Sequence, residues 1–256
     1  MKDKRVIQID TDPKAIGGGL HPDIALVADA ALTAETILYW LDEAEIAASG
    51  FTHDLDIAAL TAHPTEKDKT ADGFINYVYA LERLEESLPN DRVLVTDGGR
   101  FMTEVWCRLS VPNPQSFIGT VNFGAIGLGL QEAVGASLAA PDRPVVSFTG
   151  DGGFMIGGIN EFNTAVRLGL DLIIIVANDS AYGAELIQFV DRKMDPSLTE
   201  FNWPSFASIA KSLGGDGFQV HSKEQLEEAL EALENRKGPF LIELKLDPAN
   251  VPRMRI

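Results

Sequence analysis

The sequence has few of the features that several common classes of protein depend on. It contains one cysteine, Cys107, in 256 residues, which excludes an intrachain disulfide and a cysteine-cluster metal site. Basic residues are scarce, because 21 Lys and Arg stand against 38 Asp and Glu, for a net charge of −17. Nucleic acid and anionic membranes require a basic surface, so neither is expected as a partner. We expect a cytoplasmic protein that charge repulsion keeps dispersed.

Long hydrophobic runs are also missing. The longest apolar run, residues 172–177, is far shorter than the roughly 20 residues of a membrane-spanning helix. The first residues, MKDKRVIQIDTDP, lack the apolar core that follows the charges in a secretory signal. The composition is 45% hydrophobic and 23% charged, which is ordinary for a globular chain of one or two domains.

Short β-branched runs alternate with longer helical patterns along the chain. Residues 172–177 are apolar on both faces of a strand, which is typical of a parallel sheet covered on both sides. The right-handed crossover rule then predicts an α/β fold, a doubly wound and mostly parallel sheet with helices on both faces. The predicted strands are 5–9, 92–96, 144–148, 172–177, 218–220 and 240–246, and the predicted helices are 33–45, 73–88, 124–138, 160–168, 203–213 and 223–235.

Polar loops follow two consecutive buried strands. The motif GDGG occupies 150–153, and NDS occupies 178–180. Ligands bind at the carboxyl ends of such strands, so we expect Asp151 and Asp179 to converge there. Mg²⁺ prefers one or two carboxylates together with phosphate oxygens and water. The glycines would let backbone N–H groups approach a phosphate, and the next helix would add its positive end unless the glycine pair 157–158 delays its start.

Each loop by itself has a simpler interpretation. A G-D-G sequence is common in loops, and an Asp-Ser pair is typical of a turn or a helix cap. Their combination on consecutive strands of one parallel sheet is more specific, and it indicates a site for a metal-bridged diphosphate.

From Val93 onward, the chain resembles the diphosphate-binding domain of thiamine diphosphate-dependent enzymes of the acetolactate synthase and benzoylformate decarboxylase group. The family signature is G-D-G followed by N-N or a variant, and it reads GDGG…NDSAYG here. The resemblance implies a thiamine diphosphate-binding fold, with Mg²⁺ held by Asp151, Asp179 and the main-chain oxygen of Ala181. Asp179 stands where the family usually has Asn. If the register slips by one residue, Asn178 and Ser180 take these roles instead.

Two further segments resemble the same family. In NFGAIGLG, at 122–129, the resemblance implies that Ile126 props the cofactor into a folded shape beside the Gly124 carbonyl; an ordinary core position at a helix start stays open for Ile126. In DGGRF, at 97–101, Arg100 is implied to touch the diphosphate, although it could compensate the Asp179 charge or lie on the surface. The full set of implied cofactor contacts is Gly99, Arg100, Gly124, Ile126, Gly150, Asp151, Gly152, Gly153, Asp179, Ala181, Tyr182 and Gly183.

The stretch from Val6 to Ala30, which contains IDTDP, resembles the last part of the family's central domain. We therefore expect a central-domain remnant over 1–45, a linker over 46–72 and the diphosphate-binding domain over 73–256. The chain then corresponds to about the C-terminal half of a family member, and the remnant favours a truncation over a natural split.

The resemblance implies a decarboxylase or carboligase acting on 2-oxo acids. The family's activating glutamate lies in a pyrimidine-binding domain that this chain lacks, so its catalytic residues are unknown, and we expect a complementary chain or domain and an oligomer. One alternative is a non-catalytic or regulatory cofactor-binding subunit. Another is a Rossmann-type nucleotide-binding domain, which residues 124–129 disfavour because they lie well past the preceding strand.

Overall fold

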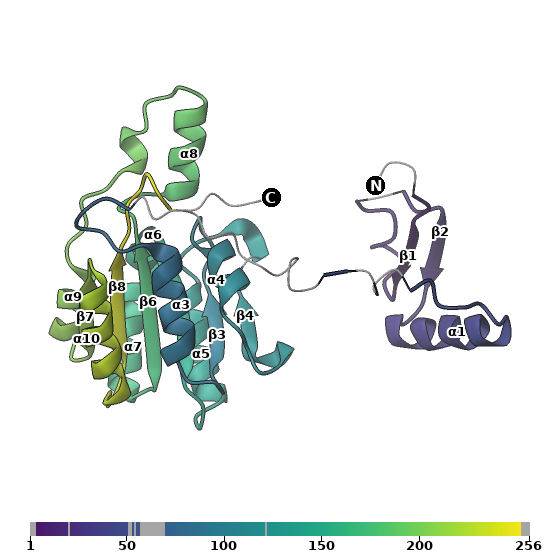
Figure 1. Ribbon diagram of the computed structural model, residues 1–256, viewed down its shortest axis with the longest axis horizontal. Coiled ribbons are helices and arrows are strands. Elements are labelled where there is room, and N and C mark those ends of the chain that lie inside the picture. Colours follow the sequence, from purple (N-terminus) through teal and green to yellow (C-terminus); the bar gives the residue numbers. More distant parts are fainter. Residues whose placement is uncertain are drawn as a thin grey trace. The chain divides into compact units, whose positions relative to one another are not determined.

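A computed structural model of the chain describes residues 4–19, 21–50, 53, 55–56, 70–120 and 122–251. The chain forms two compact units, Met1–Thr65 and Glu66–Ile256 (Figure 1). Much of the predicted linker, residues 46–72, lies outside the described residues. Within the described ranges, no helix is long and apolar enough to cross a membrane.

The first unit pairs strand β1 (Ile7–Asp10) in parallel with β2 (Ile24–Val27), and helix α1 (Ala30–Glu43) follows. The side chain of Asp29 begins α1 by accepting hydrogen bonds from two backbone N–H groups of its first turn. None of the described residues of this unit is buried. The sequence predicted β1 and α1, shifted by a few residues, and missed β2.

The second unit is built on six parallel strands in the order β4-β3-β5-β6-β8-β7. Strands β5 and β6 lie side by side in register, from Val145 opposite Leu172 to Gly150 opposite Ala177. The sequence predicted every strand except the short β4. The bounds are β3 (Val93–Thr96), β4 (Phe117–Gly119), β5 (Val145–Gly150), β6 (Leu172–Asn178), β7 (Asp216–Val220) and β8 (Phe240–Lys245).

Helices cover both faces of this sheet (Figure 1). Ile173 and Ile175 of β6 belong to a hydrophobic cluster with α3, α4 and α10, whereas Leu172 and Ile174 belong to a cluster with α5, α7 and α9. The predicted doubly wound α/β fold is therefore confirmed. The helices are α3 (Tyr77–Ser87), α4 (Met102–Arg108), α5 (Gly129–Ala139), α7 (Ile159–Leu168), α9 (Phe206–Ser212) and α10 (Lys223–Glu234).

Several predicted helix boundaries are wrong. The helix predicted over 124–138 begins only at Gly129, because Phe123, Gly124 and Gly127 have φ angles of 74°, 63° and 84°, which a helix does not accommodate. The helix predicted over 203–213 starts at Phe206, after an N-cap. Helices α4 and α8 (Gly183–Asp191) were missed, since they span only 7 and 9 residues, shorter than the window of about 11 residues over which helical periodicity is recognised.

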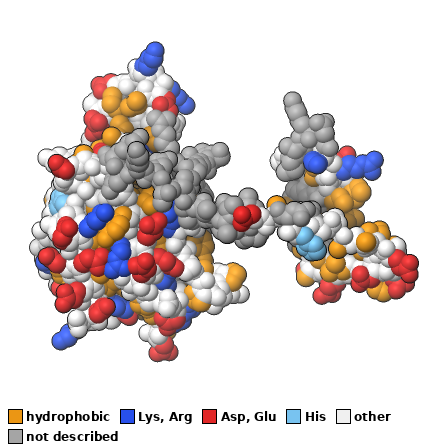
Figure 2. All heavy atoms as spheres, viewed as in Figure 1, with side chains coloured by type: hydrophobic (Ala, Val, Ile, Leu, Met, Phe, Trp, Pro, Cys, Tyr) orange, Lys and Arg blue, Asp and Glu red, His pale blue; other side chains and the backbone are white. Residues whose placement is uncertain are grey.

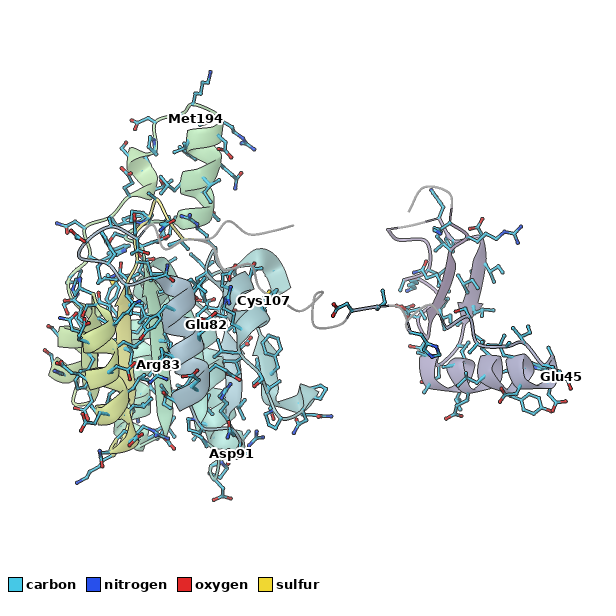
Figure 3. The ribbon with its side chains drawn as sticks, in the orientation of Figure 1. Glu45, Glu82, Arg83, Asp91, Cys107 and Met194 are labelled. Atoms are coloured by element: carbon cyan, nitrogen blue, oxygen red, sulfur yellow. The ribbon has the colours of Figure 1, made fainter. Side chains whose placement is uncertain are left out.

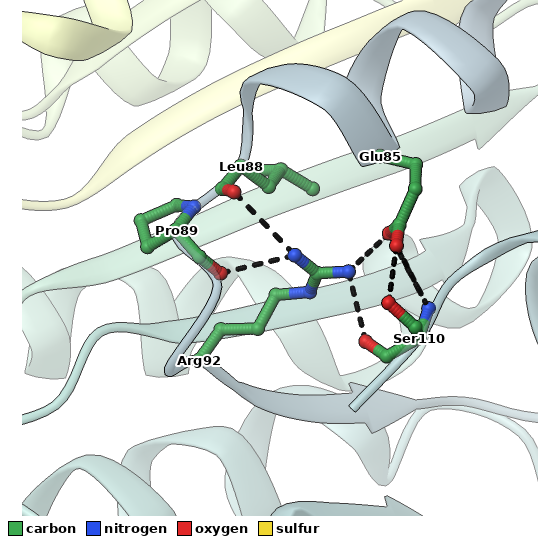
Figure 4. A network of polar contacts seen from close by, with 5 residues as sticks. All are labelled: Glu85, Leu88, Pro89, Arg92 and Ser110. Carbon is green, nitrogen blue, oxygen red and sulfur yellow. Dashed lines mark hydrogen bonds and ion pairs between the residues drawn. The ribbon is translucent and has the colours of Figure 1, made fainter. Parts of the chain in front are cut away.

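Arg92 is the largest buried basic side chain of the described core, and it joins three segments (Figure 4). Its guanidinium donates to the carbonyls of Leu88, Pro89 and Ser110 and forms an ion pair with Glu85. It thus connects the end of α3 and the segment after α4 to the start of β3.

Arg92→Leu is expected to destabilise the protein by about 3 kcal/mol, because it leaves several buried acceptors without their donor. Denaturant unfolding measures the change. Arg83→Leu, on the exposed side of α3, is the matched control (Figure 3). Arg83 pairs with Glu227 in a surface where acidic and basic side chains alternate (Figure 2), so a loss of under about 1 kcal/mol is expected. Equal losses for the two variants would contradict the role given to Arg92.

Candidate functional site

The carboxyl ends of β3, β5 and β6 open onto one cavity of about 250 Å³. Its lining comes from the segments that follow these strands, from the segment before α5 and from the stretch after β8. All the residues for which the sequence implied cofactor contact lie on this cavity: Gly99, Arg100, Gly124, Ile126, Gly150, Asp151, Gly152, Gly153, Asp179, Ala181, Tyr182 and Gly183.

A helix starts at Asp151, immediately after β5. Helix α6 (Asp151–Gly153) continues through a π-turn, Phe154–Gly158, into α7. The glycine pair 157–158 therefore does not delay the start of the helix, a possibility that the sequence left open. A Cβ atom on Gly157 would lie 2.3 Å from the Gly127 carbonyl oxygen, so that glycine serves close packing rather than helix termination. The positive end of the helix consequently lies at the cavity.

The Asp151 carboxylate is almost fully buried and accepts three hydrogen bonds. Its Oδ2 accepts from the Ala181 N–H at 3.1 Å and from Trp203 Nε1 at 2.8 Å, and its Oδ1 accepts from the Gly152 N–H at 2.9 Å. Burial and, to a smaller extent, the nearby Asp179 carboxylate together raise the pKa of Asp151 to about 7. The two acidic groups predicted to converge therefore lie close enough to repel each other.

The Asp179 carboxyl is also buried, which raises its pKa to about 6 despite the Arg100 guanidinium 3.7 Å away. The described residues contain no cluster of three or more His, Cys, Asp or Glu side chains that could hold a metal. An ion between Asp151 and Asp179 would therefore take its other oxygens from the main chain, water or a ligand.

Asn178, the ligand of the alternative register, has its side chain engaged elsewhere. Its Nδ2 donates to Glu243 Oε1 at 2.7 Å, and its Oδ1 accepts from the Ser180 N–H at 3.0 Å. Ser180 has a φ of 59°, so these bonds hold the loop in a left-handed turn that presents Asp179 to the cavity. Glu243 was not predicted, although an acidic residue inside the apolar strand FLIELK is a detectable signal.

Asp97 organises the other side of the cavity. Its buried carboxylate accepts from Thr149 Oγ1 at 3.0 Å, from the Gly127 N–H at 2.8 Å and from Thr120 Oγ1 at 3.2 Å. It thus ties the ends of β3, β4 and β5 to the segment before α5. A Cβ atom on Gly153 would lie 2.4 Å from Asp97 Oδ2, so this contact requires glycine. Asp97 was not predicted as a site residue; in its loop only Gly99 and Arg100 were.

Three aromatic side chains pack together beside Asp151, and one of them, Tyr182, lines the cavity. A Cβ atom on Gly152 would lie 2.3 Å from the ring of Tyr182, which packs edge-on against Phe201 with the centroids 4.6 Å apart. Phe201 stacks in turn on Trp203 at 4.4 Å. Gly152 and Gly153 of the GDGG motif are thus required by side-chain packing, a reason that the sequence did not reveal. Trp203 was not predicted as a site residue. The sequence around it contains no motif, and the only available signal was that tryptophan is a rare residue type that can donate a hydrogen bond.

Two open alternatives are resolved by position. Arg100 is only 8% exposed, so the surface interpretation was wrong. Ile126 precedes α5 by three residues and lines the cavity, so it is not a core residue at the start of that helix.

Asp179→Asn is expected to stabilise the metal-free protein by about 3 kcal/mol at about pH 8. Burial raises the pKa of Asp179 from 3.8 to about 6. Above about pH 6 the carboxyl must therefore ionise in a buried place, which lowers the free energy of unfolding. Below about pH 3.8 it is protonated in both the folded and the unfolded state, and the gain from the substitution vanishes. Thermal unfolding in a chelator measures the difference. A gain of the same size at about pH 3 would contradict this cause, as would no gain at about pH 8.

Comparison with known proteins places these motifs in context. Residues 97–244 match the family model described as thiamine pyrophosphate enzyme, C-terminal TPP binding domain. The chain is 32% identical over 171 residues to the acetolactate synthase isozyme 2 large subunit of Escherichia coli K12, covering 65% of this chain and 31% of that protein. It is 26% identical over 272 residues to sulfoacetaldehyde acetyltransferase of Castellaniella defragrans, covering 95% and 45%.

The fold is similar to solved structures too. Benzoylformate decarboxylase from Polynucleobacter necessarius superposes with a TM-score of 0.79 at 21% identity, covering 100% of this chain and 46% of that one. The chain spans less than half the length of each of these proteins.

Proposed function

Because this chain belongs to the thiamine pyrophosphate enzymes, through their C-terminal TPP-binding domain, we propose that its cavity holds the diphosphate of thiamine diphosphate by way of one Mg²⁺. The observation that carries the proposal is the pair of buried carboxylates, Asp151 and Asp179, on one cavity at the ends of adjacent strands. Burial and mutual repulsion raise the pKa of Asp151, and a divalent cation between the two groups would relieve both effects.

The donor set fits Mg²⁺. Asp151 and Asp179 would supply two carboxylate oxygens and Ala181 its main-chain oxygen, and phosphate oxygens and water would complete an octahedron. The loop that carries Asp179 and Ala181 is held by backbone hydrogen bonds to residues 199–201. The Tyr182 N–H donates to the Thr199 carbonyl, and the Phe201 N–H donates to the Ser180 carbonyl. The helix that begins at Asp151 would add its positive end toward the diphosphate.

The remaining residues on the cavity would position the organic part of the cofactor. Ile126 would prop it in a folded shape, with the Gly124 carbonyl and the Ile126 N–H bonding its aminopyrimidine. Gly99, the glycines of the 150–153 motif and residues 181–183 all line the cavity, and their backbone would approach the diphosphate. When bound, thiamine diphosphate supplies the electron sink for cleavage next to a carbonyl group, and this chain anchors and orients it.

We further propose that the activity is decarboxylation or carboligation of a 2-oxo acid, of the acetolactate synthase kind. The activating carboxylate would come from a pyrimidine-binding domain, on another chain or elsewhere in a longer protein, within a homo- or hetero-oligomer. The assignment of residues 1–45 as a central-domain remnant and a cytoplasmic location belong to the same proposal.

Isothermal titration of the chain with thiamine diphosphate, in Mg²⁺ and in a chelator, tests the proposed site. We expect weak binding that depends on Mg²⁺, because the proposed pyrimidine-binding domain would supply the rest of the cofactor's surroundings. Equal affinity in the chelator would remove the metal from the site, and the absence of binding in both conditions would reject the proposed function.

A further inference from the structure

Arg100 lies beside the proposed metal site, and its environment is unusual for a residue that binds phosphate directly. Its Nη1 is 3.7 Å from Asp179 Oδ2, and the two side chains are only 7% and 10% exposed. We propose that Arg100 is a positioning residue that neutralises Asp179 and fastens the segment after β8 beside it, and that it does not bind the diphosphate. The inference rests on the proposed function, because it assigns a role within that site.

Backbone acceptors fix the guanidinium in place. Nη1 donates to the Pro248 carbonyl at 3.0 Å, and Nη2 donates to the Val251 carbonyl. The same segment is tied to the metal-site loop, since the Leu246 N–H donates to the Asn178 carbonyl at 2.8 Å. Leu246 and Val251 both line the cavity. Arg100 therefore connects the loop after β3 to the segment after β8, and this connection directs its charge at Asp179.

Close packing keeps the Arg100 and Asp179 side chains together. A Cβ atom on Gly183 would lie 2.8 Å from Asp179 Oδ2 and 3.0 Å from Arg100 Cδ. Only glycine at this position leaves room for both side chains. The ion pair is thus part of a specific packing arrangement and not an incidental contact between long surface side chains.

A charge count explains why the pair matters for an anionic ligand. Asp151, Asp179, Arg100 and one Mg²⁺ sum to +1, which favours a diphosphate. Lys245, whose charge also acts on Asp179, is present in every variant and does not change the comparison. Without Arg100 the sum is zero, and buried charges interact strongly because little solvent screens them. Replacing Asp179 by Asn as well removes one negative charge and restores +1. The second substitution is therefore expected to rescue the first.

The test is a double-mutant cycle of Arg100→Gln, Asp179→Asn and the two combined. Thiamine diphosphate is titrated into each full-length variant at saturating Mg²⁺. We expect Arg100→Gln to weaken binding about tenfold and the double variant to return to within about threefold of the unmodified chain. If Arg100 instead binds the diphosphate directly, the double variant stays as weak as Arg100→Gln, which overturns the inference. Unchanged binding by Arg100→Gln overturns it as well.

Thermal unfolding of the same four proteins in a chelator tests the charge pairing of Arg100 with Asp179 without metal or cofactor. It therefore separates the inference from the proposed function. We expect Asp179→Asn to raise Tm by several degrees more in the Arg100→Gln background than in the unmodified chain, because there the carboxylate has lost the partner of its ion pair. Equal shifts in the two backgrounds would overturn the charge pairing. If the unmodified chain fails to bind the cofactor, the proposed function fails, and this arm still decides the pairing.

Discussion

Asp151→Ala is expected to abolish Mg²⁺-dependent binding of thiamine diphosphate, lowering the affinity at least about 100-fold. Asp151 would be a direct ligand of the ion, and its carboxylate also accepts the N–H groups of Ala181 and Trp203. The substitution therefore removes a ligand oxygen and loosens the loop that would provide the main-chain ligand. Titration calorimetry with and without Mg²⁺ measures both effects.

Two variants show whether such a loss is specific. Asp142→Ala removes an exposed carboxylate before the amino end of β5, far from the cavity in the sheet, and should leave binding unchanged. Asp179→Asn should retain Mg²⁺-dependent binding, since an amide oxygen can replace the carboxylate oxygen. Near-normal binding by Asp151→Ala would refute the metal assignment. Complete loss in Asp179→Asn would mean that the site needs its second negative charge.

The second large effect is an absence of turnover. The chain on its own, supplied with thiamine diphosphate, Mg²⁺ and a 2-oxo acid such as pyruvate, is expected to release carbon dioxide no faster than the cofactor alone. Cofactor activation needs a positioned carboxylate that exchanges protons with the cofactor ring. Neither Asp151 nor Asp179 is available for that task, because both would be metal ligands. Carbon dioxide release, with a complete acetolactate synthase as positive control, measures this.

Turnover well above that background would contradict the account, because it would require an activating group on this chain. The candidate to replace first would then be Glu185, the acidic side chain of α8 that lines the cavity. Activity that appears only after mixing with a pyrimidine-binding chain would instead support the proposed division of the active site.

The general placement of the site could be predicted from the sequence. Strand β6 is apolar on both faces and directly follows β5 and its helix, so the parallel order of the two strands and the common edge of their loops follow from pattern rules. Asp151 and Asp179 are the residues next to those strand ends. The proximity of Asp151 and Asp179 therefore follows from local sequence pattern and strand order, both of which can be inferred from a single sequence.

The contacts that shape the site could not be predicted, because they join residues far apart in the chain. Trp203 reaches Asp151 across 52 residues, and Glu243 reaches Asn178 across 65. The backbone before α5 was misjudged for a different reason. Phe123 has a φ of 74°, and only glycine identity at its neighbours hinted at left-handed geometry there. Burial, not residue type, also decided between the alternatives for Arg100.

The most direct test of the account is a crystal structure of the chain with thiamine diphosphate and Mg²⁺, with Mn²⁺ substituted to identify the ion by anomalous scattering. We expect one octahedral ion about 2.1 Å from an oxygen of Asp151, an oxygen of Asp179, the Ala181 carbonyl and oxygens of the diphosphate. A diphosphate bound without an ion, or an ion that contacts neither carboxylate, would contradict it.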